Sequence, residues 1–146
     1  MSDFADLDPA VRPGIAALAA QMSAHGTERD TPVRAVMALL GDRWTTLILL
    51  VLEIGEWRHA ELRRTLARLS AEQAISQRVL TLKLRQLEAD GFVLRSVSGD
   101  VPPKVSYRLS PLGLSLVGEA HRLIDWVIAH SGAIGAARDR FSKHEA

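Results

Sequence analysis

The chain has 146 residues, 47% of them hydrophobic and 24% charged, which is the composition of one ordinary globular domain and excludes an intrinsically disordered chain. Because the chain contains no cysteine, disulfide frameworks, thiolate metal sites, cysteine nucleophiles and thiol redox switches are excluded as well. The net charge of +1 is unevenly spread: residues 1–30 carry −3, residues 31–108 carry +4 and residues 109–146 carry none, so a polyanion is a candidate partner for the middle of the chain.

The N-terminal segment and the hydropathy pattern predict the cellular localisation of the protein. The first 25 residues begin with acidic side chains and lack the basic segment that opens a signal peptide. The longest apolar run, residues 47–52, is much shorter than the ~20 residues needed to cross a bilayer. We therefore expect a soluble, cytoplasmic protein without a membrane partner.

Two helices are predicted near the N-terminus. Pro13 lies at the start of an alanine-rich helix that ends before Gly26, and the polar residues 25–30 form a linker. Pro32 suits the first turn of a second helix, whose apolar residues recur at helical spacing until Gly41 ends it.

Two short helices and a strand are predicted next. Asp42 is a good N-cap for a helix that stops near Gly55. Residues 57–58 are predicted to form a short strand. The helix predicted at residues 59–69 has one apolar face, which carries Leu62, Leu66 and Leu69.

A longer helix follows a connection at residues 70–75. Ser76 is placed to cap this helix, which runs to Asp90 and has Gly91 in the C′ position. At 100° per residue, one side of the helix is apolar and is predicted to enter the core. That side carries Leu80, Leu84, Leu87 and, at its edge, Val79.

The pattern then changes from helical to alternating. Residues 92–97 and 104–109 alternate and are rich in β-branched side chains, so they predict a β-hairpin with a long loop. Ser110 and Pro111 open a last helix that reaches about His130 and is followed by a Gly- and Ala-rich tail.

This order of elements predicts a mainly α, α+β fold: a winged helix-turn-helix with extra N- and C-terminal helices for dimerisation. We assign residues 1–30 to an N-terminal arm with one helix and a linker, residues 31–110 to a DNA-binding domain, and residues 111–146 to a C-terminal dimerisation helix and tail. In such a fold one helix crosses the DNA backbone, the next enters the major groove, and the hairpin wing reaches toward the minor groove.

The outward face of the helix capped by Ser76 carries side chains that pair with DNA. Guanidinium, amide and hydroxyl groups match guanine, adenine and phosphate groups. The groove candidates are Ser76, Gln77, Arg78, Thr81 and Arg85. The phosphate candidates are Arg58, His59, Arg64 and, in the wing, Lys104. Leu82 also lies on the outward face and does not fit this polar set.

Several motifs occur in the order found in one known family. They are Gly41-Asp42-Arg43-Trp44, Glu61-Leu62-Arg63-Arg64, Leu80-Thr81, Leu84-Arg85-Gln86-Leu87-Glu88-Ala89-Asp90-Gly91, Val101-Pro102-Pro103-Lys104-Val105-Ser106-Tyr107 and Leu109-Ser110-Pro111-Leu112-Gly113. Over about residues 31–127 the chain resembles the HxlR-type winged-helix transcriptional regulators of bacteria. The resemblance implies a homodimeric DNA-binding regulator whose terminal helices form the dimer interface.

Three features depart from that family. Thr31 stands where many members have a cysteine, which excludes thiol sensing by that route. The connection at residues 70–75 is longer than the usual turn between the two helices, and Leu82 stands where a polar residue is more usual. The docking angle of the recognition helix and the base contact at position 82 therefore do not carry over from the family.

Apolar stripes near both ends of the chain predict a dimer. The interface candidates are Ile15, Leu18, Met22, Leu116, Leu123, Trp126 and Val127. A two-fold dimer presents two recognition helices to successive major grooves, ~34 Å apart, and so favours an inverted-repeat operator. The alternative is that both stripes fold back onto their own monomer.

Two other classes of function stay open beside DNA binding. A winged helix that binds only protein would keep its partner when Arg78 and Arg85 are substituted. An enzyme is not expected, because the sequence holds no catalytic motif. His121 and Asp125 have the spacing of metal ligands but lack a third ligand, so neither a metal nor a cofactor is expected. The operator and the identity of any small-molecule effector also stay open.

Overall fold

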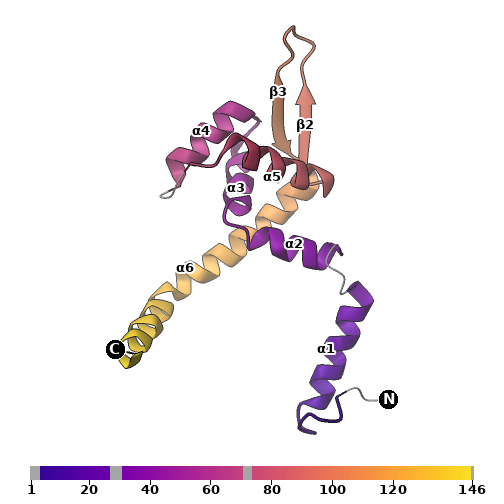
Figure 1. The fold of residues 1–146 in the computed structure, drawn as a ribbon, viewed down its shortest axis with the longest axis vertical. Helices are drawn as coiled ribbons and strands as arrows, with labels where there is room; N and C mark the ends of the chain where they lie inside the picture. The colour runs from indigo at the N-terminus through magenta and orange to yellow at the C-terminus, as the bar shows by residue number, and fades with distance from the viewer. Residues whose placement is uncertain (1–3, 27–30, 71–73, 146) are drawn as a thin grey trace. The chain divides into compact units, whose positions relative to one another are not determined.

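The computed structural model describes residues 4–26, 31–70 and 74–145 (Figure 1). The chain divides into two compact units, residues 1–42 and residues 43–146. The elements in chain order are α1 (Arg12–His25), α2 (Pro32–Leu40), α3 (Thr45–Ile54), β1 (Trp57–Arg58), α4 (His59–Leu69), α5 (Gln77–Ala89), β2 (Val93–Val97), β3 (Val105–Leu109) and α6 (Pro111–Glu145). The predicted mainly helical fold with one small sheet is confirmed.

The first unit holds α1 and α2, the two helices predicted near the N-terminus. α1 begins at Arg12, whose Nε donates to the Leu7 carbonyl at 2.8 Å. Gly26 follows α1 with a φ of 88°, a conformation in which glycine is strongly preferred. α2 begins at Pro32, as predicted. No residue of either helix is buried, so the described part of this unit has no hydrophobic core of its own.

The start of α3 differs from the prediction that Asp42 is its N-cap. Asp42 lies in the turn that closes α2, where its backbone N–H donates to the Leu39 carbonyl at 3.0 Å. α3 begins three residues later, at Thr45, after the N-cap Trp44. Both side chains are buried, at 1% and 9% exposure. The helix therefore starts where its first residues can enter the core, and not at the nearest capping carboxylate.

The hydrophobic core lies in the second unit, where α3 packs against α4, α6 and β3. Its largest fully buried side chains include Ile48, Leu49, Leu62, Leu66, Leu80 and Leu84. Leu69 shares the predicted apolar face of α4 with Leu62 and Leu66, but as the last residue of the helix it is 59% exposed. No single helix in the described ranges is long and apolar enough to cross a membrane.

Both predicted ends of α5 are confirmed. The Val79 backbone N–H donates to Ser76 Oγ at 3.1 Å, which makes Ser76 the N-cap. At the other end Asp90 is the C-cap, and Gly91 has a φ of 81°, the left-handed conformation of a C′ glycine. Local capping therefore determines the length of the helix that carries the groove candidates.

The sheet is antiparallel, with strand order β1-β3-β2. In the hairpin of β2 and β3, Val93 pairs with Leu109. The loop is closed by Ser98, whose backbone N–H donates to the Lys104 carbonyl at 2.8 Å. Figure 1 shows this hairpin beside α5, with which β2 is in contact. The predicted hairpin and the short strand β1 are both confirmed, and together with α4 and α5 they form a winged helix-turn-helix.

α6 is longer than predicted, since the sequence predicts a helix that reaches about His130 and is followed by a Gly- and Ala-rich tail. It runs to Glu145, a span of 35 residues, or about 52 Å at ~1.5 Å per residue. Gly132 and Gly135 each cost the helix only about 1 kcal/mol relative to alanine, and no proline follows Pro111 to stop it. Its buried residues all lie in the first three turns, so the C-terminal half extends away from the core (Figure 1).

Candidate nucleic-acid interface

The outward face of α5 is the first part of the candidate interface. The opposite face enters the core as predicted, since Leu80, Leu84 and Leu87 are at most 1% exposed. A shallow hollow of about 530 Å³ on the outward face is lined by Gln77, Arg78, Thr81, Leu82 and Arg85. The structure thus brings four of the five groove candidates together, and the fifth, Ser76, caps the same helix.

Val79 and Leu82 are two apolar residues of α5 that do not lie in the core. Val79 is predicted at the edge of the core face but is 36% exposed, because it lies about 100° around the helix from the centre of the leucine face. Leu82 is 52% exposed and lies in the hollow among the polar side chains, as its helical position predicts. The candidate reading surface therefore includes one apolar side chain.

His59 is a predicted phosphate candidate, and the structure places it against α5. Its Nε2 lies 3.0 Å from Thr81 Oγ1, and its ring centroid lies 6.4 Å from that of Tyr107. Burial of the ring and, second, the positive charge of Arg63 lower the pKa of His59 below 6.5. This imidazole therefore connects α4, α5 and β3, and only its other nitrogen, once protonated, is left to meet a phosphate.

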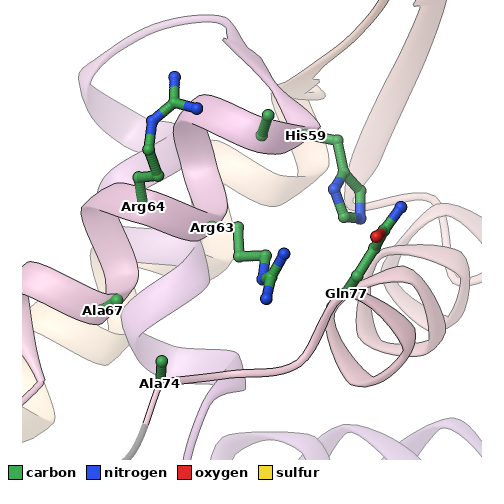
Figure 2. Close-up of a pocket in the computed structure, with 7 residues that line it drawn as sticks. His59, Arg63, Arg64, Ala67, Ala74 and Gln77 are labelled. Atoms are coloured by element: carbon green, nitrogen blue, oxygen red, sulfur yellow. The ribbon is translucent and has the colours of Figure 1, made fainter.

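A basic pocket of about 360 Å³ lies between α4 and the start of α5 (Figure 2). It is lined by His59, Ala60, Arg63, Arg64, Ala67, Ala74 and Gln77. The side chains of His59, Arg63 and Gln77 turn toward its open centre, whereas the guanidinium of Arg64 points away from them. Because the alanines are small, the cationic groups remain accessible, and the pocket has the character of an anion site.

Arg63 is a pocket residue that the sequence patterns do not single out. Its Nε donates to the Ile75 carbonyl at 3.1 Å and so attaches the end of the connection to α4. Its spacing of four residues from His59 is the signal that places both side chains on one face of α4. Residues 71–73 of the predicted connection lie outside the described residues.

The remaining phosphate candidates, Arg58 and Lys104, lie together in a different place. They line a pocket of about 390 Å³ between β1 and the hairpin loop. Three carboxylates, from Glu56, Glu61 and Asp100, line the same pocket and offset the two cations. The four phosphate candidates are thus divided between a cationic pocket on α4 and a mixed pocket at the wing.

Arg95 is a second residue that the sequence reasoning misses. It lines a cleft between α5 and the hairpin together with Thr81, Arg85, Glu88 and Tyr107. The alternation of β2 is a signal that could have found it, because Arg95 shares a strand face with the buried Val93. The α5 surface is therefore continuous with a cation on the wing.

His121 does not pair with Asp125 as the spacing of metal ligands would allow. Its Nε2 lies 2.8 Å from Glu53 Oε1, so the contact joins α6 to α3. Both side chains are substantially exposed, and such ion pairs contribute little to stability. The contact is a link between two helices of the same unit.

Comparisons with known proteins agree with this geometry. The pattern of the HxlR-like helix-turn-helix family matches residues 39–133. The regulator YtcD of Bacillus subtilis is 41% identical over 98 residues, which cover 67% of this chain and 73% of the relative. The regulator YtfH of Escherichia coli is 35% identical over 108 residues, covering 74% and 81% of the two chains.

A solved structure gives the same result in three dimensions. The transcriptional regulator YtfH from Salmonella typhimurium aligns with a TM-score of 0.62 and 33% sequence identity, over 77% of this chain and 95% of that one. The family pattern covers well over half of the 146 residues, and it includes the helix-turn-helix and the wing. The chain belongs to the HxlR-like helix-turn-helix family and is a transcriptional regulator.

Proposed function

We propose that the protein binds double-stranded DNA in a sequence-specific way, as a cytoplasmic homodimer on an inverted-repeat operator. One observation carries this proposal: two guanidinium groups, an amide and a hydroxyl gather on the exposed face of α5. These are the groups that pair with base edges and phosphates in a major groove. The core packing of the opposite face holds α5 in place while its outward face meets the DNA.

In this proposal Arg78 is the principal base-reading side chain. It lies in the first turn of α5, the part of a recognition helix that contacts base edges. Among the described residues no ion-pair partner of Arg78 occurs, so its fork is available to guanine O6 and N7. The groove surface is completed by Ser76, Gln77, Thr81 and Arg85, with the exposed Leu82 among them.

Phosphate contacts flank the groove surface on both sides. The α4 pocket supplies Arg63, Arg64 and, once its second nitrogen is protonated, His59. The pocket between β1 and the hairpin loop supplies Arg58 and Lys104. Such contacts position a protein on the duplex without reading its sequence. Each neutralised phosphate adds about 0.9 to the magnitude of the slope of log affinity against log salt.

The dimer is proposed from exposed apolar side chains on α1 and α6. On α6 the predicted interface residues Leu123, Trp126 and Val127 are 58%, 55% and 44% exposed, and Leu116 is half-buried. On α1, Leu18 and Met22 are 50% and 48% exposed, and Ile15 is half-buried. A second copy that covers these stripes would remove a large apolar surface from water.

Selection of bound fragments from the source genome, followed by titration of the enriched duplex, tests the proposal. We expect fragments that share an inverted repeat, preferred over unrelated duplexes, and affinity that falls steeply with salt. Failure to retain any duplex, or a flat salt response, would favour the alternative of a winged helix that binds only protein. Enrichment of direct or unpaired half-sites would retain DNA binding and overturn the two-fold dimer.

A further inference from the structure

We infer that Arg85 and Arg95 form a clamp for one phosphate of the DNA backbone, in the cleft between α5 and the wing. The wing here is the hairpin of residues 93–109. The inference rests on the proposed DNA binding, and it assigns a role to Arg95 that the groove and wing candidates do not include. It also places Arg85 on the backbone at the edge of the groove, whereas Arg78 reads bases.

The cleft is formed by two elements that are distant in the sequence. It has a volume of about 400 Å³, with Thr81, Arg85 and Glu88 contributed by α5 and Arg95 and Tyr107 contributed by the hairpin. Thr81 and Arg85 also line the hollow on the outward face of α5. The cleft is therefore the lateral continuation of the groove-facing surface toward the wing.

The pairing of the hairpin determines the direction of the Arg95 side chain. Val93 and Leu109 pair with each other, both are buried, and they face the core. Arg95 pairs with Tyr107 two residues farther along, so strand alternation places it on the same face. Arg108 is one residue from Tyr107 and lies on the opposite face.

Both guanidinium groups of the cleft are available to a ligand. Arg85 and Arg95 are exposed, and within the ranges that the structure describes neither has an ion-pair or hydrogen-bond partner. Two guanidinium groups against the single carboxylate of Glu88 leave the cleft with a net positive charge. A guanidinium offers its N–H groups in a planar fork that matches two phosphate oxygens.

The position of the cleft selects DNA backbone as the source of the phosphate. A recognition helix enters the major groove and the wing reaches toward the minor groove. One backbone strand separates these two grooves, so it has to pass between the helix and the wing. Arg85 and Arg95 lie on the two sides of that path and would hold the same phosphate from both.

Arg95→Ala and Arg108→Ala provide a matched test, because each removes one guanidinium from the hairpin but from opposite faces. The measurement is fluorescence anisotropy with the selected operator and with an unrelated duplex, over a series of salt concentrations. We expect Arg95→Ala to weaken both duplexes roughly tenfold and to reduce the magnitude of the salt slope by about 0.9. We expect Arg108→Ala to leave affinity and slope unchanged, and Arg85→Ala to behave like Arg95→Ala.

Two further variants probe the charge of the cleft. Arg95→Lys keeps the positive charge but lacks the planar guanidinium fork. We therefore expect it to keep the wild-type salt slope and to lose less affinity than Arg95→Ala. The same variant tests the clamp if Arg95→Ala fails to fold. Glu88→Gln removes the only carboxylate of the cleft and is expected to tighten binding to both duplexes by a few-fold. Thermal unfolding of each variant provides the check that the fold is kept.

Each other outcome has a definite meaning. If the wild type binds its operator while Arg95→Ala and Arg108→Ala lose the same amount, the clamp is wrong and the proposed function stands. A loss for Arg95→Ala that is confined to certain operator bases replaces the phosphate contact with base reading by the wing. If the wild type binds no duplex, both the proposed function and the clamp are wrong.

Discussion

Thr81 Oγ1 donates its single proton to the Gln77 carbonyl, at 2.9 Å, so His59 Nε2, which lies 3.0 Å from the same oxygen, is the donor in their contact. The proton of His59 is therefore on Nε2, and the imidazole holds α4 against the first turns of α5. Thr81 has no proton left for a base or a phosphate, and it can meet DNA only as an acceptor. The hydroxyl thus helps to position the recognition helix.

The first prediction follows from the lowered pKa of His59, which burial and, second, Arg63 keep below 6.5. Well above pH 6.5 the ring is neutral in both the folded and the unfolded state, and it adds no pH dependence to the free energy of unfolding. Below pH 6.5 the unfolded chain takes up a proton first, so stability falls until the pH passes the pKa of the folded state. Urea unfolding at several pH values across this window measures the loss.

His59→Gln is the matched variant for that prediction, because its amide keeps a donor toward Thr81 and does not titrate. We expect the variant to lose less stability than the wild type as the pH falls below 6.5. Other histidines contribute equally to both proteins and cancel in the comparison. Equal pH dependence of the two proteins would contradict the burial of a neutral His59.

How much the sequence predicts depends on whether a feature is local. Ser76 and Gly91 mark the ends of α5 correctly, because a cap contacts its own helix. Arg63 and Arg95 are missed, because their roles depend on the elements that lie opposite them, Ile75 for one and α5 for the other. The length of α6 is also missed, since two glycines weaken a helix without ending it.

The second prediction compares two glycines of α6. A Cβ at Gly113 would collide with the Phe92 carbonyl oxygen, whereas a Cβ at Gly118 would meet nothing within 4 Å. Gly113→Ala is expected to destabilise the protein by about 1–3 kcal/mol, since the buried first turn has no room to adjust. Gly118→Ala is expected to stabilise it by up to about 1 kcal/mol through helix propensity. Thermal unfolding of both variants measures the two changes in stability. Changes of the same sign would contradict the packing of α6 against Phe92, the residue before β2.

The third prediction separates base reading from phosphate binding. Arg78→Ala is expected to reduce the preference for the operator over a duplex with mutated half-sites by about 1–3 kcal/mol, because a guanidinium bidentate to guanine discriminates between bases. Lys104→Ala is expected to weaken both duplexes alike and to lower the salt slope, because a phosphate contact is blind to sequence. Titration of both variants with both duplexes measures the difference. Equal losses on every duplex for Arg78→Ala would exclude base reading by this side chain.

The last prediction concerns the dimer. Leu123 lies at the centre of the exposed apolar stripe of α6, with Leu116, Trp126 and Val127 within about 60° of it around the helix. Leu114 is 50% exposed, comparable to the 58% of Leu123, but it lies about 180° away on the same helix. The two leucines therefore allow the same substitution on the proposed interface and on the opposite side.

Light scattering is expected to give the wild type a mass of twice 16.0 kDa at about micromolar concentration. Leu123→Asp would place an unpaired carboxylate in the interface and is expected to produce a monomer, whereas Leu114→Asp is expected to remain a dimer. Removal of residues 1–25 tests the contribution of α1, and it is expected to weaken the dimer because Leu18 and Met22 leave with it. A wild-type mass near 16.0 kDa would mean that α6 has no partner helix, and an operator would then be read by one recognition helix at a time.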